Sequence, residues 1–189
     1  MTNEQKNSEY DPRAVANLIL QVIHNPPTQL ALQKLLYFAH GAFLLRTKRP
    51  LVSGYFEAWN YGPVHPAIYA AFKKHGNSPI SNLAKRKDIR TGAFLEISIP
   101  TDPDVVKTTK KVVSSLEDMT PGQLVALSHA DGGPWHQVYR RSKSEHMLGL
   151  RISNEMIRER YRAHWFPADK LESVDEPTED SPITYYRSG

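Results

Sequence analysis

The sequence predicts a mainly α (α+β) fold, a compact helical domain of six or seven helices with a small antiparallel β-sheet or hairpin. Two observations carry this prediction. Apolar residues recur at helical spacing through most of the chain, and only two short stretches have the pattern of strands. The 189 residues are 40% hydrophobic and 10% aromatic, which is enough for one core.

Four predicted helices begin with the same sequence pattern, a potential capping residue followed by a proline in the first helical position. Proline suits that position because its missing N–H would have had no partner in the helix. Asp or Thr before it can accept a hydrogen bond from the free amides of the first turn. The pairs are Asp11-Pro12, His65-Pro66, Asp102-Pro103 and Thr120-Pro121, of which Thr120 has capping-box spacing to Gln123 and His65 is an uncommon cap.

The first helix is predicted over residues 12–24, where Asn25-Pro26-Pro27 ends it, and Thr28 can cap the next. That second helix, QLALQKLLYFAHGAFLLRT at 29–47, is apolar on nearly every side, which is typical of a helix in the centre of a domain. Gly41 in its interior costs about 1 kcal/mol relative to Ala. We therefore expect another element to pack closely against Gly41.

Two strands are predicted, YFEAWNY at 55–61 and GAFLEISIP at 92–100, the second because apolar and polar residues alternate in it. Gly62 and Pro63 are expected to form the corner that leads from the first strand into a helix over 66–75. A basic loop is expected before the second strand, made by Lys85, Arg86, Lys87 and Arg90.

The rest of the chain is predicted to be helical until a polar tail begins. Helices are expected over 103–117 and 121–130, a helix or turn from Trp135 onward, and a last helix over 153–164 with Ser153 as its cap. Residues 1–166 form the predicted helical domain. Residues 167–189 form an acidic, proline-containing C-terminal tail that is expected to be extended or disordered.

The charge is divided unevenly between body and tail. Residues 1–168 hold 22 Lys or Arg and 14 Asp or Glu, a net charge of +8, whereas residues 169–189 hold 2 and 6, a net charge of −4. A basic body can attract nucleic acid or an acidic protein, and a merely solvated surface is the alternative. The chain has no Cys, which excludes disulfides and thiolate chemistry. Because no signal-peptide pattern or long apolar run is present, we expect a soluble cytoplasmic protein without membrane contact.

The motifs of common enzyme classes are absent: there is no Gly-rich phosphate loop, G-x-S-x-G, H-E-x-x-H or paired-carboxylate signature. His129, Asp131 and His136 can be drawn as a metal cluster, but the Gly-Gly-Pro between them leaves their directions undetermined, and a locally hydrogen-bonded turn is the preferred interpretation. His40 is interpreted as a core histidine. We therefore predict no metal, no cofactor and no enzymatic activity. An enzyme acting through Trp59, His65, His129 and Trp135 is the alternative.

Three segments taken together resemble the Panacea domain of the SocA-like antitoxin family: LQKLLYFAHGAFLL at 32–45, EAWNYGPVHPAIYAAF at 57–72 and LSHADGGPW at 127–135. Their order and spacing match, and the similarity spans residues 12–166. The resemblance implies a mainly helical domain of toxin–antitoxin pairs and prophages that neutralises a protein toxin, encoded by the adjacent gene, by direct binding. Delivery of the toxin to a protease is an alternative, and the family is not known as a class of enzymes.

The candidate partner-binding residues fall into two groups. Around the corner after the first strand we expect Trp59, Tyr61, His65, His129 and Trp135. This corner is interpreted chiefly as a structural node, with Trp135 packed against it, and a partner-binding or small-ligand pocket is the alternative. In the tail, Ile183, Tyr185 and Tyr186 follow an acidic stretch and could anchor it on a basic toxin. The tail could instead fold back on the basic body or remain solvated without a role.

Two further partner predictions accompany this site. The chain is expected to form a toxin–antitoxin hetero-oligomer or a homo-oligomer. A second function class is nucleic-acid binding that regulates the chain's own operon. The net charge of +8 on residues 1–168 motivates it, although no clear helix-turn-helix is present.

Overall fold

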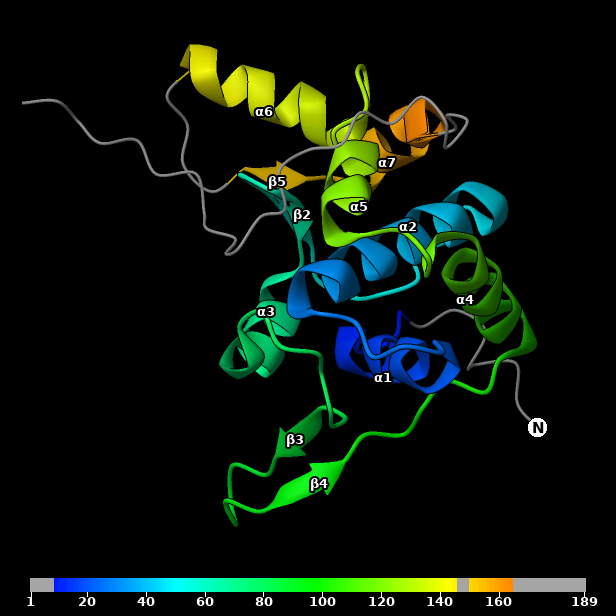
Figure 1. Cartoon of the computed structure of the whole chain (residues 1–189), viewed down its shortest axis with the longest axis vertical. Coiled ribbons are helices and arrows are strands. Elements are labelled where there is room, and N and C mark those ends of the chain that lie inside the picture. The colour runs from blue at the N-terminus through cyan, green and yellow to red at the C-terminus, as the bar shows by residue number, and fades with distance from the viewer. Residues whose placement is uncertain (1–8, 146–149, 165–189) are drawn as a thin grey trace, which may run out of the picture.

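The computed structural model describes residues 9–145 and 150–164 and confirms the predicted fold class. Seven α-helices lie in these ranges, together with two small antiparallel sheets. Figure 1 shows α2 (Gln29–Thr47) in the middle of the domain with other helices around it. These are α1 (Pro12–Val22), α3 (Pro66–Phe72), α4 (Pro103–Leu116), α5 (Pro121–Ser128), α6 (Pro134–Glu145) and α7 (Asn154–Arg160), with short 3-10 helices η2 (Lys73–His75) and η3 (Tyr161–His164).

The predicted helix caps are confirmed. The Asp11 side chain accepts a hydrogen bond from the Arg13 amide, and Ser153 accepts one from the Met156 amide. Thr120 and Gln123 form the reciprocal capping box at the start of α5. Each such cap stabilises its helix by about 1 kcal/mol. The His65 side chain makes no cap hydrogen bond, as its residue type suggested.

Helix α2 is buried on nearly all sides and joins the residues of all neighbouring elements into one core. The close approach expected at Gly41 is made by Tyr161 of η3. A Cβ atom at position 41 would lie 2.9 Å from Tyr161 Cζ and would overlap the adjacent ring carbons. The Tyr161 hydroxyl donates a 2.7 Å hydrogen bond to the Phe38 carbonyl, which fixes the ring over the glycine.

A three-stranded sheet covers one side of α2, with β1 (Phe56–Trp59) between β2 (Gly62–Val64) and β5 (Arg151–Ile152). The predicted corner at Gly62 and Pro63 is wrong, because both residues belong to β2 and pair with β1. The chain reverses instead at Asn60 and Tyr61. Two properties allow a strand to begin at once: Gly62 adopts the φ of +101° that it needs, and Pro63 lies on an edge strand, where a missing donor is tolerated.

The predicted basic loop and second strand form a separate hairpin, so both predictions need correction. Lys85–Lys87 is strand β3, and the strand expected over 92–100 shortens to β4 (Phe94–Glu96). Asp88 organises the connection by accepting hydrogen bonds from the amides of Arg90 and Thr91. All six strand residues are exposed, and the apolar residues of the alternating pattern become half-buried only after β4 ends, at Ile97 and Ile99.

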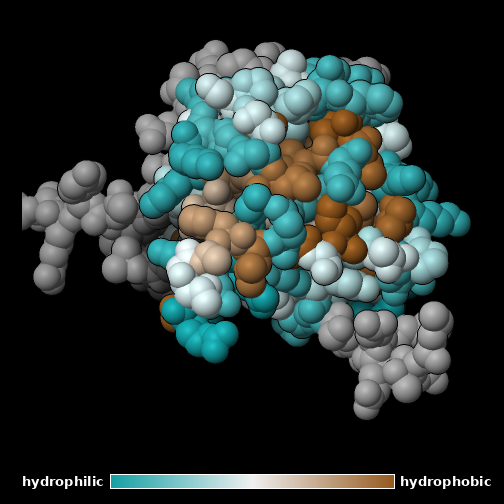
Figure 2. Space-filling view, turned by 90° about the horizontal axis from the view of Figure 1, so that it is seen from below, coloured by the Kyte–Doolittle hydropathy of each residue, from teal (hydrophilic) through white to brown (hydrophobic). Residues whose placement is uncertain are grey.

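This hairpin projects from one end of the domain (Figure 1). Figure 2 views the molecule from that end and shows hydrophobic surface gathered in the centre and right of the face among hydrophilic side chains. Two large apolar side chains of the hairpin are open to solvent, Ile89 at 101% and Phe94 at 68% of their full exposure.

Smaller differences concern helix ends. The first helix ends at Val22 rather than at residue 24, and the helix predicted over 66–75 divides into α3 and η2. The helix or turn expected from Trp135 is helix α6. The predicted tail lies outside the described residues, so the domain boundary at 166 stays a prediction. In the described part of the chain, no helix combines the length and apolar character that a membrane span requires.

Candidate functional site

Five ring side chains meet where the β1–β2 hairpin adjoins α3, α5 and α6. We call this group the tryptophan corner: Trp59, Tyr69, His129, Trp135 and Tyr139. The Trp135 ring is sandwiched between His129, at a centroid distance of 3.6 Å, and Tyr139, at 4.4 Å. Its indole N–H donates a 2.8 Å hydrogen bond to the Trp59 carbonyl, and Trp59 packs edge-on against Tyr69 at 4.8 Å. The predicted packing of Trp135 against this corner is thus confirmed.

A tight turn places Trp135 so close to the end of α5. Gly132 has a φ of +72°, and a Cβ at Gly133 would lie 2.8 Å from the Ala130 carbonyl oxygen. Only glycine fits both conditions without strain. Because Pro134 then opens α6, the indole of Trp135 points back across the end of α5 toward β1.

A buried lysine lies beneath the corner. Lys34 of α2 is 0% exposed, and its ammonium donates a 3.1 Å hydrogen bond to the Pro63 carbonyl. A Cβ at Gly62 would lie 3.2 Å from Lys34 Nζ and would overlap the Ser128 hydroxyl, so the absence of a side chain at 62 makes room for the lysine. Sequence reasoning assigned Lys34 no role, because its position on an apolar helix gives no signal of the buried carbonyl it meets.

The electrostatics of the corner keep His129 neutral. Burial lowers the pKa of His129 to about 3, and the nearby Lys34 ammonium acts in the same direction. Its Nε2 atom is buried and has no hydrogen-bond partner among the described residues. The ring therefore serves as a neutral stacking surface for Trp135 rather than as a general acid at neutral pH.

The exposed part of the corner is its rim. Trp59 and Trp135 keep only 6% and 5% of their exposure, so nearly all of their surface is used inside the domain. Tyr69, His129 and Tyr139 are half-buried and present their outer edges to solvent. These edges are accessible to a partner, whereas the indoles of Trp59 and Trp135 pack beneath them and hold them in place.

The other predicted site residues do not join this cluster. His65 is 3% exposed, and its ring lies against the Ser53 carbonyl and the Phe56 ring, away from the rings of the corner. Its Nε2–H donates to the Ser53 carbonyl at 2.9 Å, and burial lowers its pKa. Tyr61 lies half-buried in the β1–β2 turn. Ile183, Tyr185 and Tyr186 lie outside the described residues.

His129, Asp131 and His136, considered above as a metal cluster, do not converge, and Asp131 and His136 belong to a locally hydrogen-bonded turn. The Gly132 amide donates a 3.1 Å hydrogen bond to His136 Nδ1, and an Asp131 carboxylate oxygen lies 2.9 Å from the same nitrogen. His129 instead stacks on Trp135. In residues 9–145 and 150–164, no group of three or more His, Cys, Asp or Glu side chains is placed to hold a metal ion.

The structure reveals a second candidate surface that sequence reasoning missed, a groove of about 750 Å³ between α2 and α4. We call it the α2–α4 groove. Its apolar lining comes from α2, α4, the turn after α4, α5 and η3: Phe38, Ala42, Leu45, Val112, Leu116, Met119, Leu127 and Tyr161. Its polar lining is Arg46, Asp104, Lys107, Thr108, Lys111, Ser115 and His164. The available signal was the apolar stripe of α4, of which Val112 and Leu116 stay half-buried in the structure.

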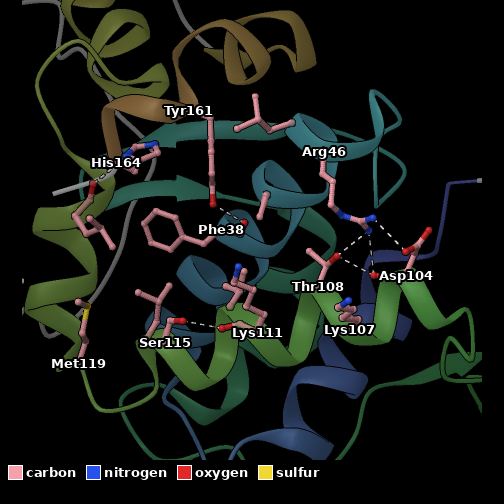
Figure 3. A pocket seen from close by; sticks show the side chains of 15 residues that line it. Phe38, Arg46, Asp104, Lys107, Thr108, Lys111, Ser115, Met119, Tyr161 and His164 are labelled. Carbon is pink, nitrogen blue, oxygen red and sulfur yellow. Dashed lines mark hydrogen bonds and ion pairs between the residues drawn. The ribbon is translucent and has the colours of Figure 1, made fainter. Parts of the chain in front are cut away.

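Figure 3 shows how the polar residues border this groove. Arg46 closes one end by pairing with Asp104 at 3.1 Å and donating to Thr108 at 3.0 Å, and Met119 lies at the other end. Burial lowers the pKa of His164 to about 4. His164 is therefore neutral at pH 7, so the net positive charge of the groove comes from Lys107 and Lys111 on α4.

A family model described as "Antitoxin SocA-like, Panacea domain" matches residues 32–136. The protein named Antitoxin SocA from Caulobacter vibrioides (strain NA1000 / CB15N) is 41% identical over 181 residues, which cover 94% of this chain and 96% of that protein. No solved structure matches.

Proposed function

Because this chain belongs to the SocA-like antitoxin family and carries its Panacea domain, we propose that it is the antitoxin of a toxin–antitoxin pair and neutralises its protein toxin by direct binding. The observation that carries the proposal is the similarity to Antitoxin SocA along nearly the whole of both chains. The residues covered by this similarity include those of the tryptophan corner and of the α2–α4 groove. The family thereby supports an antitoxin role and implies a toxin as partner.

Direct binding requires a surface that can exclude water over a sizeable area. Three parts of the chain support it: the α2–α4 groove, the half-exposed rim of the tryptophan corner and the acidic, aromatic tail. In this proposal Tyr61 and His129 contact the toxin, while Trp59, His65 and Trp135 hold the surface in shape. Ile183, Tyr185 and Tyr186 add anchors, which suits tyrosine because aromatic side chains dominate many interfaces.

Co-expression tests this function. Production of the protein encoded by the adjacent gene should arrest growth, and simultaneous production of this chain should restore it. The two purified proteins should also co-elute as one complex. If the adjacent product is harmless alone, or stays toxic beside this chain, the antitoxin proposal is wrong. If growth is restored while the half-life of the toxin falls, delivery to a protease replaces direct inhibition.

A truncation in the same assay tests the tail. Deletion of residues 168–189 should leave the helical circular dichroism unchanged, because the described core ends at His164. Affinity for the toxin should fall at least about tenfold, since acidic side chains steer the encounter and tyrosines anchor it. Unchanged affinity in a folded truncation removes the tail from the interface. An unfolded truncation indicates instead that the tail packs on this chain's own body.

The β3–β4 hairpin favours one second candidate function, nucleic-acid binding at the chain's own promoter. All three residues of β3 are cationic and exposed, and the ring of Phe94 on β4 is open to solvent. Exposed cations bind phosphates, and an exposed ring can stack on a base. Asp88 and Glu96 oppose this binding, and Glu96 already pairs with Lys85 at 2.6 Å.

A gel-shift titration with promoter DNA decides this second candidate. Binding should weaken steeply as salt rises, and replacing Arg86, Lys87 and Arg90 by Ser should remove about three units from the salt slope. These side chains are exposed, so the fold should not change. If the unaltered chain shows no salt-sensitive binding, nucleic-acid recognition is rejected and the antitoxin proposal is unaffected.

A further inference from the structure

We propose that the α2–α4 groove is the docking site for an amphipathic helix of the toxin, one with an apolar stripe bordered by carboxylates. This inference rests on the proposed antitoxin function and specifies which surface acts and what chemistry it selects. Helix-in-groove recognition uses a concave apolar floor that receives side chains at helical spacing.

The floor of the groove has the required apolar character. Phe38, Leu127 and Tyr161 form its deepest part and are each at most 5% exposed. Leu45 and Leu116 line its sides and remain half-buried, so a ligand would complete their burial. Each Å² of apolar surface removed from water contributes about 25 cal/mol, which makes this area a source of affinity.

The dimensions of the groove suit a short helix. The α4 residues that line it recur every three or four positions, from Asp104 to Leu116. At 1.5 Å per residue this stripe is about 18 Å long, the length of a helix of roughly twelve residues. Such a helix presents apolar side chains at i, i+3, i+4 and i+7 along one face.

The charge of the border selects the partner. Lys107 and Lys111 stand one turn apart on α4, and both are exposed. Among the described residues neither ammonium has a carboxylate partner, whereas Arg46 is already paired with Asp104. Carboxylates on the docked helix would therefore find two available cations. Opposite charges also accelerate the encounter and exclude basic partners.

Two other occupants are disfavoured for different reasons. If the grooves of two copies met, two cationic borders would be brought together, and like charges in an interface are unfavourable. The chain's own tail is acidic, but Pro177 and Pro182 interrupt the stretch that holds its acidic and aromatic residues. Proline inside a helix costs about 3 kcal/mol, so that segment cannot fill the groove as a continuous helix.

The experiment reverses both border charges in the full chain, with a control that has the same net charge. Lys107→Glu/Lys111→Glu is compared with Lys73→Glu/Lys74→Glu, whose lysines are equally exposed but lie on η2, outside the groove. The probe is the purified product of the adjacent gene, titrated by calorimetry at two salt concentrations. A third variant, Met119→Gln, tests the apolar end of the groove with little change in side-chain volume.

The groove variants should lose affinity by at least about tenfold for the double reversal and about threefold for Met119→Gln. The η2 control should lose much less and keep its salt dependence. Equal affinities in the groove and η2 variants would overturn the inference while leaving the antitoxin function intact. A rise in affinity on charge reversal would show that the chain's own tail fills the groove. A homodimer that the reversal dissociates would identify a second copy as occupant, and either result also overturns the inference.

Discussion

Lowering the pH from 7 to 4.5 should remove most of the folding free energy of this protein. The main reason is three histidines that burial of their rings keeps neutral, the buried His40 and His164 and the half-buried His129. Burial lowers the pKa of His40 to about 4, that of His129 to about 3 and that of His164 to about 4. In the unfolded chain each has an ordinary pKa near 6.5.

Acid destabilises the protein because the unfolded chain binds protons at these histidines at a higher pH than the folded protein does. Between pH 6.5 and 4 the unfolded chain takes up protons at these histidines while the folded protein does not. Their contribution to stability is therefore complete above pH 6.5 and is lost as the pH falls toward the folded values. At pH 4.5 each histidine costs about 2.5 kcal/mol, and together they cost about 7.5 kcal/mol. A domain of this kind has a total stability of about 5–15 kcal/mol.

Hydrogen bonds show why the folded state resists protonation at two of these sites. His164 donates from Nδ1 to the Leu127 carbonyl, so its Nε2 accepts from the Tyr37 hydroxyl. His40 accepts from the Val52 amide at Nδ1 and donates from Nε2 to Asn154. A second proton on either ring would break one of these bonds inside the core, in addition to burying a charge.

Urea unfolding at half-unit steps from pH 7.5 to 4.5 measures this loss. His129→Phe provides the matched variant, because it keeps a ring stacked on Trp135 and removes one titrating group. Its stability should fall less steeply with pH than that of the unaltered protein, because one of the groups with a lowered pKa is gone. Carboxylates such as Asp11, whose pKa is lowered by Arg13, lose their contribution only at lower pH. A stability that stays constant between pH 7 and 5 would contradict the prediction.

Local signals explain why most of the fold could be predicted from the sequence. Asp102-Pro103 and the Thr120–Gln123 box each contain the chemistry of a helix start within four residues, so no distant contact is needed to recognise them. The all-round apolar pattern of α2 marks the centre of the domain for the same reason. The resemblance to the family likewise rests on short segments, residues 32–45, 57–72 and 127–135.

Features made by distant residues could not be predicted. The α2–α4 groove exists because Phe38, Leu116 and Tyr161 come from three separate parts of the chain, and no single segment contains its pattern. Strand β3 of the β3–β4 hairpin, where a loop was predicted, was missed for another reason. A strand of Lys-Arg-Lys buries no face, so it lacks the alternation by which strands are recognised. The turn between β3 and β4 depends on the carboxylate of Asp88. In the sequence, nothing distinguishes Asp88 from other surface carboxylates.

The second large effect is expected at Gly41, where substitution by Ala should lower the free energy of unfolding by about 2 kcal/mol, the difference between the overpacking cost and the gain in helix propensity. Helix propensity alone predicts the opposite, a gain of about 1 kcal/mol, because Gly is the poorer residue in a helix interior. The clash decides the sign. The new methyl group would overlap the ring of Tyr161, which is 5% exposed and tied to the Phe38 carbonyl. Overpacking of this kind typically costs 1–3 kcal/mol and occasionally more.

A double-mutant cycle with Tyr161→Leu identifies the clash as the cause. Tyr161→Leu alone should be destabilising, because it removes the ring and its hydrogen bond to Phe38. Adding Gly41→Ala to it should then cost much less than it does in the unaltered protein, since the leucine leaves room for the methyl group. The expected coupling energy is about 2 kcal/mol, within the range found for residues in contact. Thermal and urea unfolding of the four proteins measure it. If the two effects simply add, or if Gly41→Ala alone stabilises the protein, the Tyr161 ring can yield at little cost and η3 is not fixed against α2 at this point.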